Sequence, residues 1–426
     1  MLDIQLIRDE PDRVRQAMHD KRIDHTEVVD AILEQDAARR DVITRLQDAQ
    51  TRSNTVSKEI GLLMREGKRD EAQERIAETG QLKEQIKTLE DQVRDRDAQL
   101  HRLLLEIPNI PHESVPVGST PDDNEVVLEE GDKPTFDFEP VPHWELIDQH
   151  GLVDFERGAK VTGAGFPFYV SQGARLQRAL VQFFLDLAVE EGGYQELQAP
   201  IFVNAASATG TGQLPDKEDQ MYEVQRDGLY AIPTSEVPVT NFFRDEILEE
   251  AQLPIKFCAY TPNFRREAGS YGKEVRGLNR LHQFDKVELV QFTHPDKSYE
   301  ALDAMRDDAE RAIRRLGLPY RRLLMCTGDM GFTQAKKYDL EVWSGGQQRW
   351  LEVSSISNME AFQARRTQIR YRPEGGGKPA FVHTLNGSGL ALPRIVAALL
   401  ENNQQADGSI VIPEALRKYT GFERIG

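Results

Sequence analysis

The sequence predicts an α+β protein in which a long antiparallel α-helical coiled-coil arm precedes a domain built on an antiparallel sheet. Three observations support this fold class. Apolar residues recur every three or four positions through residues 27–105, and seven prolines fall within residues 106–142. Beyond residue 143, helical and strand-like segments follow one another without the regular strand–helix alternation of a parallel sheet.

Residues 1–105 are predicted to be helical, with a short lead-in over residues 1–26 and two long helices after it. At ~1.5 Å per residue, a helix of roughly 35 residues is about 50 Å long. A break at 67–70 would join the two helices into a hairpin. Each helix is indicated by an apolar stripe with the three- and four-residue steps of a coiled coil. The stripes are Val42, Leu46, Ala49, Ser53, Val56, Ile60 and Leu63, and Leu82, Ile86, Leu89, Val93, Arg96, Leu100 and Leu103.

An arm of this length favours contact with a large partner. Basic side chains on its outer half could meet phosphate groups. Acidic residues are equally frequent there, so a solvated helical pair or a dimerisation coil also fits the pattern. The basic residues are Arg52, Lys58, Arg65, Lys68, Arg69 and Arg75.

Composition restricts the class of protein. The chain has 426 residues, of which 39% are hydrophobic and 29% charged, as expected for a water-soluble protein of about two domains. No apolar run approaches the ~20 residues of a membrane span, and the first residues lack a signal-peptide pattern. We therefore expect a cytoplasmic protein with no membrane partner. Cys258 and Cys326 are too few for a disulfide framework or a cysteine-rich zinc site, so no zinc is expected.

The net charge of −18 argues against a generally basic nucleic-acid-binding surface but leaves room for a local basic face. It also fits a salt-rich host cytoplasm, and in that case the stability of the protein should rise with salt.

Residues 106–142 are predicted to be a proline-rich linker, and residues 143–426 a second domain. Several segments of this domain have a clear local pattern. They are an amphipathic helix over 173–191, a strand over 194–200, a polar turn over 232–236, a strand over 350–355, and a strand that passes through a glycine turn at 384–394 into a helix over 395–401.

The most informative stretch runs from Phe264 to Glu288. Apolar and polar residues alternate on both sides of the polar segment 268–279, which predicts two antiparallel strands joined by a long loop. Successive side chains of a strand point to opposite faces. The residues expected to share polar faces are Arg265 and Glu267 on the first strand, and Phe284, Lys286 and Glu288 on the second.

If those polar faces coincide, the patch suits an adenine nucleotide beside an amino acid. A guanidinium can bind a phosphate through two parallel hydrogen bonds, and an aromatic ring can stack on the adenine base. One carboxylate can accept a hydrogen bond from the adenine amino group, and the other from the ammonium group of the amino acid. The same pattern also fits a solvated hairpin with an Arg–Glu cross-strand pair.

Three segments, in this order, resemble motifs one, two and three of the class II aminoacyl-tRNA synthetases. They are the helix and strand that end at Pro200, the Arg-x-Glu hairpin that follows Phe264, and the segment Gly387-Ser-Gly-Leu-Ala-Leu-Pro-Arg394. With the helical hairpin and the closing segment 412–422, they resemble the bacterial type of seryl-tRNA synthetase over essentially the whole chain. Two shorter motifs belong to the same resemblance: Thr234-Ser-Glu236 and Glu352-Val-Ser-Ser355.

This resemblance implies roles around ATP. Arg265 would hold the α-phosphate, Glu267 would accept from the adenine amino group, Phe284 would stack on adenine, and Arg394 would reach the γ-phosphate. Mg²⁺ would be held by Glu352 and Ser355. The full set implied to bind ATP is Arg265, Arg266, Glu267, Leu281, Phe284, Glu352, Val353, Ser354, Ser355 and Arg394, with Arg265, Arg394 and Glu352 as the catalytic residues.

The resemblance also implies how L-serine and tRNA are bound. Thr234, Glu236 and Glu288 would enclose the serine ammonium, and Ser388 would lie near the serine side chain. The arm would grip tRNA(Ser), and tRNA(Sec) as well, in a homodimer formed through the first motif. The full set implied to bind serine is Thr234, Ser235, Glu236, Arg265, Glu288, Asn386 and Ser388.

The implied reaction needs no general base, because the serine carboxylate is already a nucleophile toward the α-phosphate. Two functions of other classes remain possible from the sequence. A ligase that delivers an amino acid to a carrier protein would be expected to lack the long hairpin, and a catalytically inactive interaction protein would be expected to have lost Arg265, Glu267, Glu352 or Arg394. A synthetase for another amino acid is the nearest alternative.

Overall fold

A computed structural model describes residues 1–267 and 276–426. Residues 268–275 of the predicted polar loop lie outside the described residues. The chain divides into two compact units. The smaller comprises Leu2–His19 and Ile23–Pro108, and the larger comprises Met1, Asp20–Arg22 and Asn109–Gly426.

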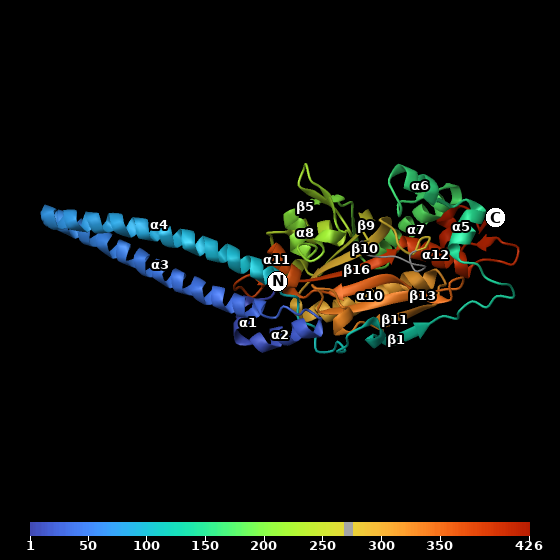
Figure 1. Ribbon diagram of the computed structural model, residues 1–426, viewed down its shortest axis with the longest axis horizontal. Helices are drawn as coiled ribbons and strands as arrows, with labels where there is room; N and C mark the ends of the chain where they lie inside the picture. Colours follow the sequence, from blue (N-terminus) through green and yellow to red (C-terminus); the bar gives the residue numbers. More distant parts are fainter. Residues whose placement is uncertain (268–275) are drawn as a thin grey trace. The chain divides into compact units, whose positions relative to one another are not determined.

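The smaller unit is a helical hairpin with two short helices at its start (Figure 1). Helices α3 (Val28–Arg65) and α4 (Arg69–Leu105) pack side by side and are 38 and 37 residues long. The turn between them uses Gly67 at φ +77°, a conformation that glycine adopts readily. The short helices are α1 (Ile4–Asp9) and α2 (Pro11–Asp20).

The predicted apolar stripes form the seam of this hairpin. Its centre is a cluster in which side chains of both helices meet: Val42, Leu46 and Ala49 with Ile86, Leu89 and Val93. The coiled-coil prediction is therefore confirmed, and so is the position of the turn.

The larger unit is organised around an eight-stranded sheet with the order β1-β11-β12-β13-β16-β10-β9-β4 (Figure 1). Neighbouring strands are antiparallel except for β4 and β9, which are parallel. The antiparallel α+β prediction is confirmed. The strands are β1 (Glu125–Glu130), β4 (Gln195–Leu197), β9 (Ile255–Phe264), β10 (Gln283–Thr293), β11 (Tyr320–Leu324), β12 (Lys336–Ser344), β13 (Arg349–Asn358) and β16 (His383–Ala391).

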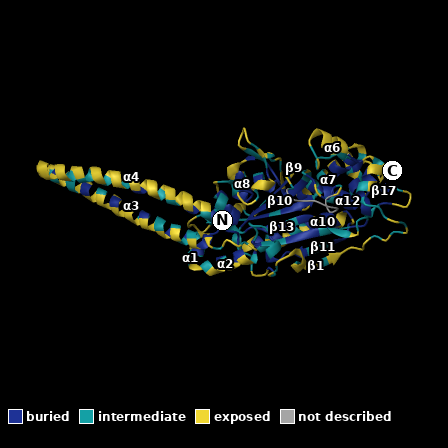
Figure 2. Ribbon diagram, in the orientation of Figure 1, coloured by how far each residue is buried: buried dark blue, intermediate teal, exposed yellow. Residues whose placement is uncertain are grey.

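One face of this sheet is covered by three helices, α7 (Ser171–Glu190), α10 (Ser298–Arg315) and α12 (Leu392–Asn402). Their apolar side chains share one core with Val287 and Leu289 of β10, and Figure 2 shows the central strands buried. On the opposite face, Val290 and Phe292 continue the row that begins at Phe284, Lys286 and Glu288. The amphipathic helix predicted over 173–191 is confirmed.

The remaining elements are short. The helices are α5 (His143–His150), α6 (Phe155–Val161), α8 (Ala205–Thr211), α9 (Glu236–Thr240), α11 (Ala361–Thr367) and α13 (Glu414–Thr420). The small sheets are formed by β2 (Val153–Asp154) with β3 (Phe168–Tyr169), by β5 (Phe202–Asn204), β6 (Tyr222–Val224) and β7 (Leu229–Ala231), by β8 (Ile247–Glu249), β14 (Arg370–Arg372) and β15 (Ala380–Phe381), and by β17 (Ile410–Val411) with β18 (Arg424–Ile425).

Three local expectations need correction. Strand β9 ends at Phe264, so Arg265 and Glu267 are not strand residues, and Glu267 has a φ of +49°. The predicted glycine turn at 384–394 is a continuous strand that runs directly into α12. Gly387 instead allows close packing, because a Cβ there would lie 3.0 Å from the Met305 sulfur of α10. The proline-rich region 106–142 contains β1, the edge strand of the main sheet, which sequence patterning did not predict.

None of the helices in the described ranges has the length and apolar content needed to cross a bilayer.

Candidate functional site

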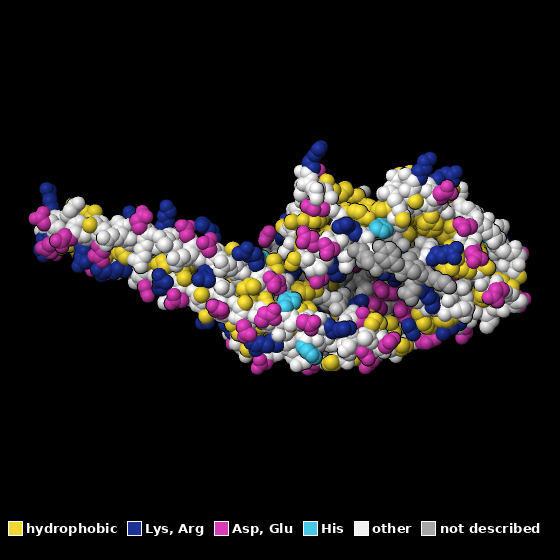
Figure 3. All heavy atoms as spheres, in the orientation of Figure 1, with side chains coloured by type: hydrophobic (Ala, Val, Ile, Leu, Met, Phe, Trp, Pro, Cys, Tyr) yellow, Lys and Arg dark blue, Asp and Glu magenta, His cyan; other side chains and the backbone are white. Residues whose placement is uncertain are grey.

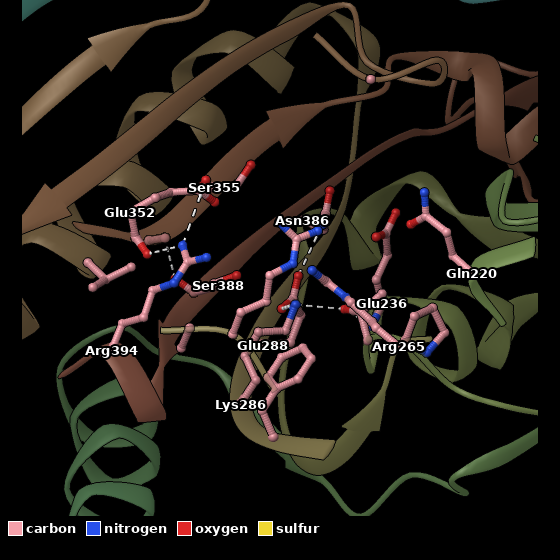
Figure 4. Close-up of a pocket in the computed structure, with 18 of the residues that line it drawn as sticks. Gln220, Glu236, Arg265, Lys286, Glu288, Glu352, Ser355, Asn386, Ser388 and Arg394 are labelled. Carbon is pink, nitrogen blue, oxygen red and sulfur yellow. Dashed lines mark hydrogen bonds and ion pairs between the residues drawn. The ribbon is translucent and has the colours of Figure 1, made fainter. Parts of the chain in front are cut away.

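A cavity of about 650 Å³ opens on the polar face of the sheet, beside β10, β13 and β16 (Figure 4). Its lining includes nearly all of the residues predicted to bind ATP or serine, although they are far apart in the chain. These are Thr234, Glu236, Arg265, Glu267, Leu281, Phe284, Glu288, Glu352, Val353, Ser354, Ser355, Asn386, Ser388 and Arg394.

Two predicted residues are not among the described residues that line the cavity. Ser235 is fully buried, and its hydroxyl donates to the Ala259 carbonyl oxygen of β9 at 3.4 Å. The backbone N–H of Arg266 donates to the Gln220 carbonyl oxygen at 2.9 Å. The structure thus places Ser235 in support of the strand behind the cavity.

A bulge in β13 brings Glu352 and Ser355 to the same side. Residues three apart on a regular strand point to opposite faces. In β13, Glu352 pairs with Glu341 of β12 and Ser354 pairs with Leu340, so Val353 is an extra residue that reverses the alternation. Glu352 and Ser355 consequently both line the cavity, whereas Leu351 and Ile356 belong to the core.

At one end of the cavity lie two buried carboxylates and one buried ammonium group. Lys286 Nζ is 2.6 Å from Glu288 Oε2 and donates to Thr234 Oγ1 at 2.9 Å. Asn386 Nδ2 donates to Glu288 Oε1 at 3.0 Å. Within the described part of the chain, Asn386 Oδ1 has no hydrogen-bond partner, which leaves one acceptor available at this end.

Glu236 is the second carboxylate. Gln363 Nε2 donates to Glu236 Oε1 at 2.7 Å, and Thr384 Oγ1 fixes the orientation of that amide by donating to Gln363 Oε1 at 2.7 Å. Burial, followed by repulsion from Glu288, raises the pKa of Glu236 above its ordinary value. Lys286 and Lys217 favour the charged form of Glu236 but do not outweigh burial and Glu288, so Glu236 is an incompletely stabilised carboxylate that a ligand ammonium would complement.

The other end of the cavity presents cations and an aromatic ring. The Arg265 guanidinium lies over the Phe284 ring, 5.0 Å from its centroid. The structure gives Arg265 no side-chain hydrogen bond to another described residue, so its donors are free for an anion. Burial lowers the pKa of Arg265, against the opposing influence of Glu267 and Glu352.

Arg394, in the first turn of α12, is held in place by backbone oxygens. Its Nε donates to the Asn279 carbonyl oxygen at 3.1 Å and its Nη1 donates to the Glu352 carbonyl oxygen at 2.6 Å. The cavity walls disfavour the charged form of Glu352, but Lys337, Arg394 and Arg265 outweigh this effect and lower its pKa. Its carboxylate is therefore ionised at neutral pH, with its side chain 47% exposed.

Sequence reasoning missed several polar residues of the cavity. Gln213, Lys217, Gln220, Asn279, Arg280 and Lys337 also line it. Arg280 forms an ion pair with Glu267, and Lys337 Nζ lies 2.9 Å from Asp339 Oδ2. Lys286 lies on the face that the alternation predicts, but the sequence pattern gives it no role in the site. Lys217 lies among acidic residues and Lys337 is the second of two adjacent lysines, patterns that are common on protein surfaces, so no sequence signal marked either as a site residue.

Comparisons with known proteins identify the family of the chain. Residues 1–111 match the family described as the seryl-tRNA synthetase N-terminal domain, and residues 222–403 match the tRNA synthetase class II core domain (G, H, P, S and T). The serine–tRNA ligase of Salinibacter ruber is 64% identical over 426 residues, covering 100% of this chain and 99% of the relative. The serine–tRNA ligase of Exiguobacterium sibiricum is 51% identical over 421 residues, covering 99% and 98%.

Solved structures give the same result. The seryl-tRNA synthetase of Pyrococcus horikoshii complexed with ATP superposes with a TM-score of 0.93 at 35% identity, covering 100% of this chain and 99% of that one. The cytoplasmic serine–tRNA ligase of Naegleria fowleri in complex with AMP has a TM-score of 0.87 at 30% identity, covering 100% and 98%. With both of its units matched and full-length relatives at this identity, the chain belongs to the seryl-tRNA synthetases, the serine–tRNA ligases of the class II aminoacyl-tRNA synthetase group.

Proposed function

We propose that the cavity activates L-serine with ATP, forming seryl-adenylate and pyrophosphate, and that serine then passes to the 3′ end of tRNA(Ser). The observation that supports this most strongly is the division of one cavity into two chemically distinct ends. Buried carboxylates lie at one end, and a guanidinium stacked on an aromatic ring lies at the other.

The carboxylate end would bind serine. Its ammonium would be bound by Glu236 and Glu288, and the unpaired Asn386 Oδ1 and the Ser388 side chain would face the rest of the amino acid. A site that hydrogen-bonds the serine hydroxyl leaves polar groups unpaired when alanine binds, which disfavours alanine by about 10⁴-fold. Threonine would be excluded by lack of space.

The cationic end would bind ATP. Adenine would stack on Phe284, Glu267 would accept from its amino group, and Arg265 and Arg394 would bind the α- and γ-phosphates. The serine carboxylate would then attack the α-phosphorus as the pyrophosphate oxygen departs. The residues accelerate this step by alignment and by fixed positive charge.

Glu352 and Ser355 fit a Mg²⁺ ion. Mg²⁺ prefers oxygen ligands and commonly takes one or two from the protein, with water and substrate phosphates completing its octahedron. The bulge at Val353 puts both side chains in the cavity, and the pKa of Glu352 is lowered, which keeps the carboxylate available. Within the described residues there is no larger cluster of His, Cys, Asp or Glu that could hold a metal. When bound, Mg²⁺ would neutralise charge on the phosphates.

We further propose the domain limits 1–105 for the tRNA-binding arm, with the coiled coil at about 27–105, 106–142 for the linker, and 143–426 for the catalytic domain. Figure 3 shows basic and acidic side chains mixed along the visible face of the arm. Arg52, Lys68 and Arg75 form ion pairs with Glu78, Glu66 and Glu59 respectively. Lys58, Arg65 and Arg69 have no ion pair to a described residue, which supports them as the cations that meet tRNA phosphates.

We also propose a homodimer that works in the cytoplasm and charges tRNA(Sec) in addition to tRNA(Ser). Support for the dimer comes from apolar side chains left exposed around β9. Phe242 is 54% exposed and Tyr260 is 37% exposed, and both lie on or beside that strand.

An exchange assay across the amino acids tests the proposal. Each amino acid is incubated with ATP, Mg²⁺ and labelled pyrophosphate, and label entering ATP is measured. We expect exchange with serine alone at micromolar enzyme. Exchange with a different amino acid, or none with serine while ATP binds, would contradict the proposed substrate.

A further inference from the structure

The carboxylate of Glu401, near the end of α12, is the centre of a buried hydrogen-bond network outside the cavity. Its side chain is fully buried. Glu401 Oε1 accepts from the backbone N–H of His143 at 2.9 Å, from His143 Nδ1 at 2.7 Å and from Gln347 Nε2 at 2.9 Å. Glu401 Oε2 accepts from the Ser344 hydroxyl and from the backbone N–H groups of Gly346 and Gln347. This one carboxylate therefore joins α12, the start of α5 and the β12–β13 hairpin.

The contacts of His143 determine its tautomer. The backbone N–H of Leu278 donates to His143 Nε2 at 2.9 Å, so Nε2 must be the unprotonated acceptor. Nδ1 then carries the proton that is donated to Glu401. The close approach of the ring requires a glycine next to Leu278, because a Cβ on Gly277 would lie 2.3 Å from Nε2. Gly277 also has a φ of +66°.

Four consecutive residues, 276–279, are held by this network and its neighbours. The Arg276 guanidinium lies 4.9 Å from the ring centroid of Trp144 on α5. Gly277 and Leu278 lie against His143. Asn279 Nδ2 donates to Gln347 Oε1 at 2.8 Å, and the Asn279 carbonyl oxygen accepts from Arg394.

These four residues lead directly into the ATP end of the cavity. Leu278, Asn279, Arg280 and Leu281 line it, and Arg280 pairs with Glu267. We propose that His143 is a positioning residue for ATP: its neutral Nε2, oriented by Glu401, fixes the Leu278 N–H and thereby the segment that holds Arg394 and Glu267 in place. This inference rests on the proposed binding of ATP at that end.

The serine end is held by different contacts. Glu236 is fixed by Gln363, and Glu288 by Lys286 and Asn386. None of these residues contacts the His143–Glu401 network within the described structure. A defect in His143 should therefore alter the KM for ATP and leave the KM for serine unchanged, a separation that general destabilisation would not produce.

Two substitutions of His143 distinguish its two nitrogens. In His143→Asn, the side-chain amide takes the place of Nδ1 and can still donate to Glu401, but nothing accepts from Leu278. In His143→Gln, the longer amide oxygen takes the place of Nε2 and still accepts from Leu278. Each variant loses one buried hydrogen bond, so their losses of thermal stability should be similar. His150→Gln is the matched control, because His150 lies at the far end of α5 and its Nε2 contacts only the Gly408 carbonyl oxygen among the described residues.

Serine-dependent pyrophosphate exchange supplies the readout. We expect His143→Asn to raise the KM for ATP about tenfold, the loss of one well-placed hydrogen bond. His143→Gln and His150→Gln should stay within about twofold of the parent, and the KM for serine should not change in any of them. Equal effects of Asn and Gln on the KM for ATP, or no effect of Asn, would overturn the proposal.

Two further variants keep the test decisive. If His143→Asn does not fold, Gln347→Met removes the side-chain contacts with both Asn279 and Glu401 from a half-buried position and should raise the KM for ATP without altering that for serine. Phe284→Ala checks the underlying site. A raised KM for ATP in Phe284→Ala with none in His143→Asn would refute the positioning role alone, whereas no effect in Phe284→Ala would refute the placement of ATP.

Discussion

Replacing Glu236 or Glu288 by glutamine should change the stability of the protein in opposite directions, although both substitutions should weaken serine binding. Replacing either carboxylate by glutamine removes one negative charge and preserves size. The charged form of Glu236 is disfavoured, since burial and repulsion from Glu288 raise its pKa. Glu288 is the direct partner of Lys286, with 2.6 Å between Glu288 Oε2 and Lys286 Nζ. Glu236→Gln should therefore stabilise the empty protein, and Glu288→Gln should destabilise it.

The magnitudes follow from these contacts. Single stabilising substitutions commonly add about 0.5–2 kcal/mol to the free energy of unfolding, and we expect Glu236→Gln to fall in this range. Leaving a buried ammonium without its partner costs about 3–5 kcal/mol. For Lys286 we expect the lower end of that range, because Thr234 Oγ1 still accepts from it. For either variant, losing one charge-assisted hydrogen bond to the serine ammonium is worth about 1.5–3 kcal/mol, a roughly 10- to 150-fold rise in the KM for serine.

The assay combines thermal melting without ligands and pyrophosphate exchange over a range of serine concentrations. The expected result is a higher melting temperature for Glu236→Gln, a lower one for Glu288→Gln, and a raised KM for serine in both, with the KM for ATP nearly unchanged. A lower melting temperature for Glu236→Gln would refute the claim that the charge on Glu236 is unfavourable in the empty protein. Unchanged serine dependence in both variants would remove the pair from the serine site.

Further predictions concern pH, adenine, the metal and the arm. Because the pKa of Glu236 is raised, Glu236 is protonated at a higher pH than an ordinary glutamate, and the KM for serine should begin to rise at that higher pH as the solution is acidified. The contribution of Glu236 to stability should be gained as pH falls through its raised pKa and lost as pH rises through it. Exchange kinetics and melting curves recorded over a range of pH measure the two effects. Phe284→Ala should raise the KM for ATP by about 5- to 150-fold, the worth of one stacked base, with the KM for serine as the internal control. Glu352→Gln should increase the Mg²⁺ concentration needed for half-maximal exchange, and an unchanged Mg²⁺ titration would argue against Glu352 as a ligand. Deleting residues 27–105 should spare exchange and eliminate tRNA charging, so efficient charging by the shortened chain would assign the arm another role.

Sequence patterning predicted the parts of the fold that local periodicity determines. The heptad steps located both long helices and the turn at Gly67, and the alternation in β10 placed Glu288 and Leu289 on opposite faces. The prediction that the first strand continues beyond Phe264 was wrong, because the backbone leaves the sheet there and reaches a positive φ at Glu267. Glutamate rarely adopts a positive φ, so the residue type does not predict this conformation. Strand β1 was not predicted, because the prolines on both sides of it indicate a linker without regular structure.

The site shows the same division between local and non-local information. The motif resemblance identified most of the lining residues, but the bulge at Val353 depends on the register with β12, which no local pattern reveals. Gln363 donates a hydrogen bond to Glu236 from a short helix, and the sequence of this helix contains no motif that indicates a site residue. The repulsion between Glu236 and Glu288 likewise appears only after folding, which brings two carboxylates from different elements into one cavity.

A structure of the protein with a non-hydrolysable seryl-adenylate analogue tests the central claim most directly. We predict that the serine ammonium lies within hydrogen-bonding distance of Glu236 and Glu288, that adenine stacks on Phe284, and that Arg265 binds the bridging group in the position of the α-phosphate. An analogue bound in the reverse orientation, or outside the cavity between these residues, would contradict the account.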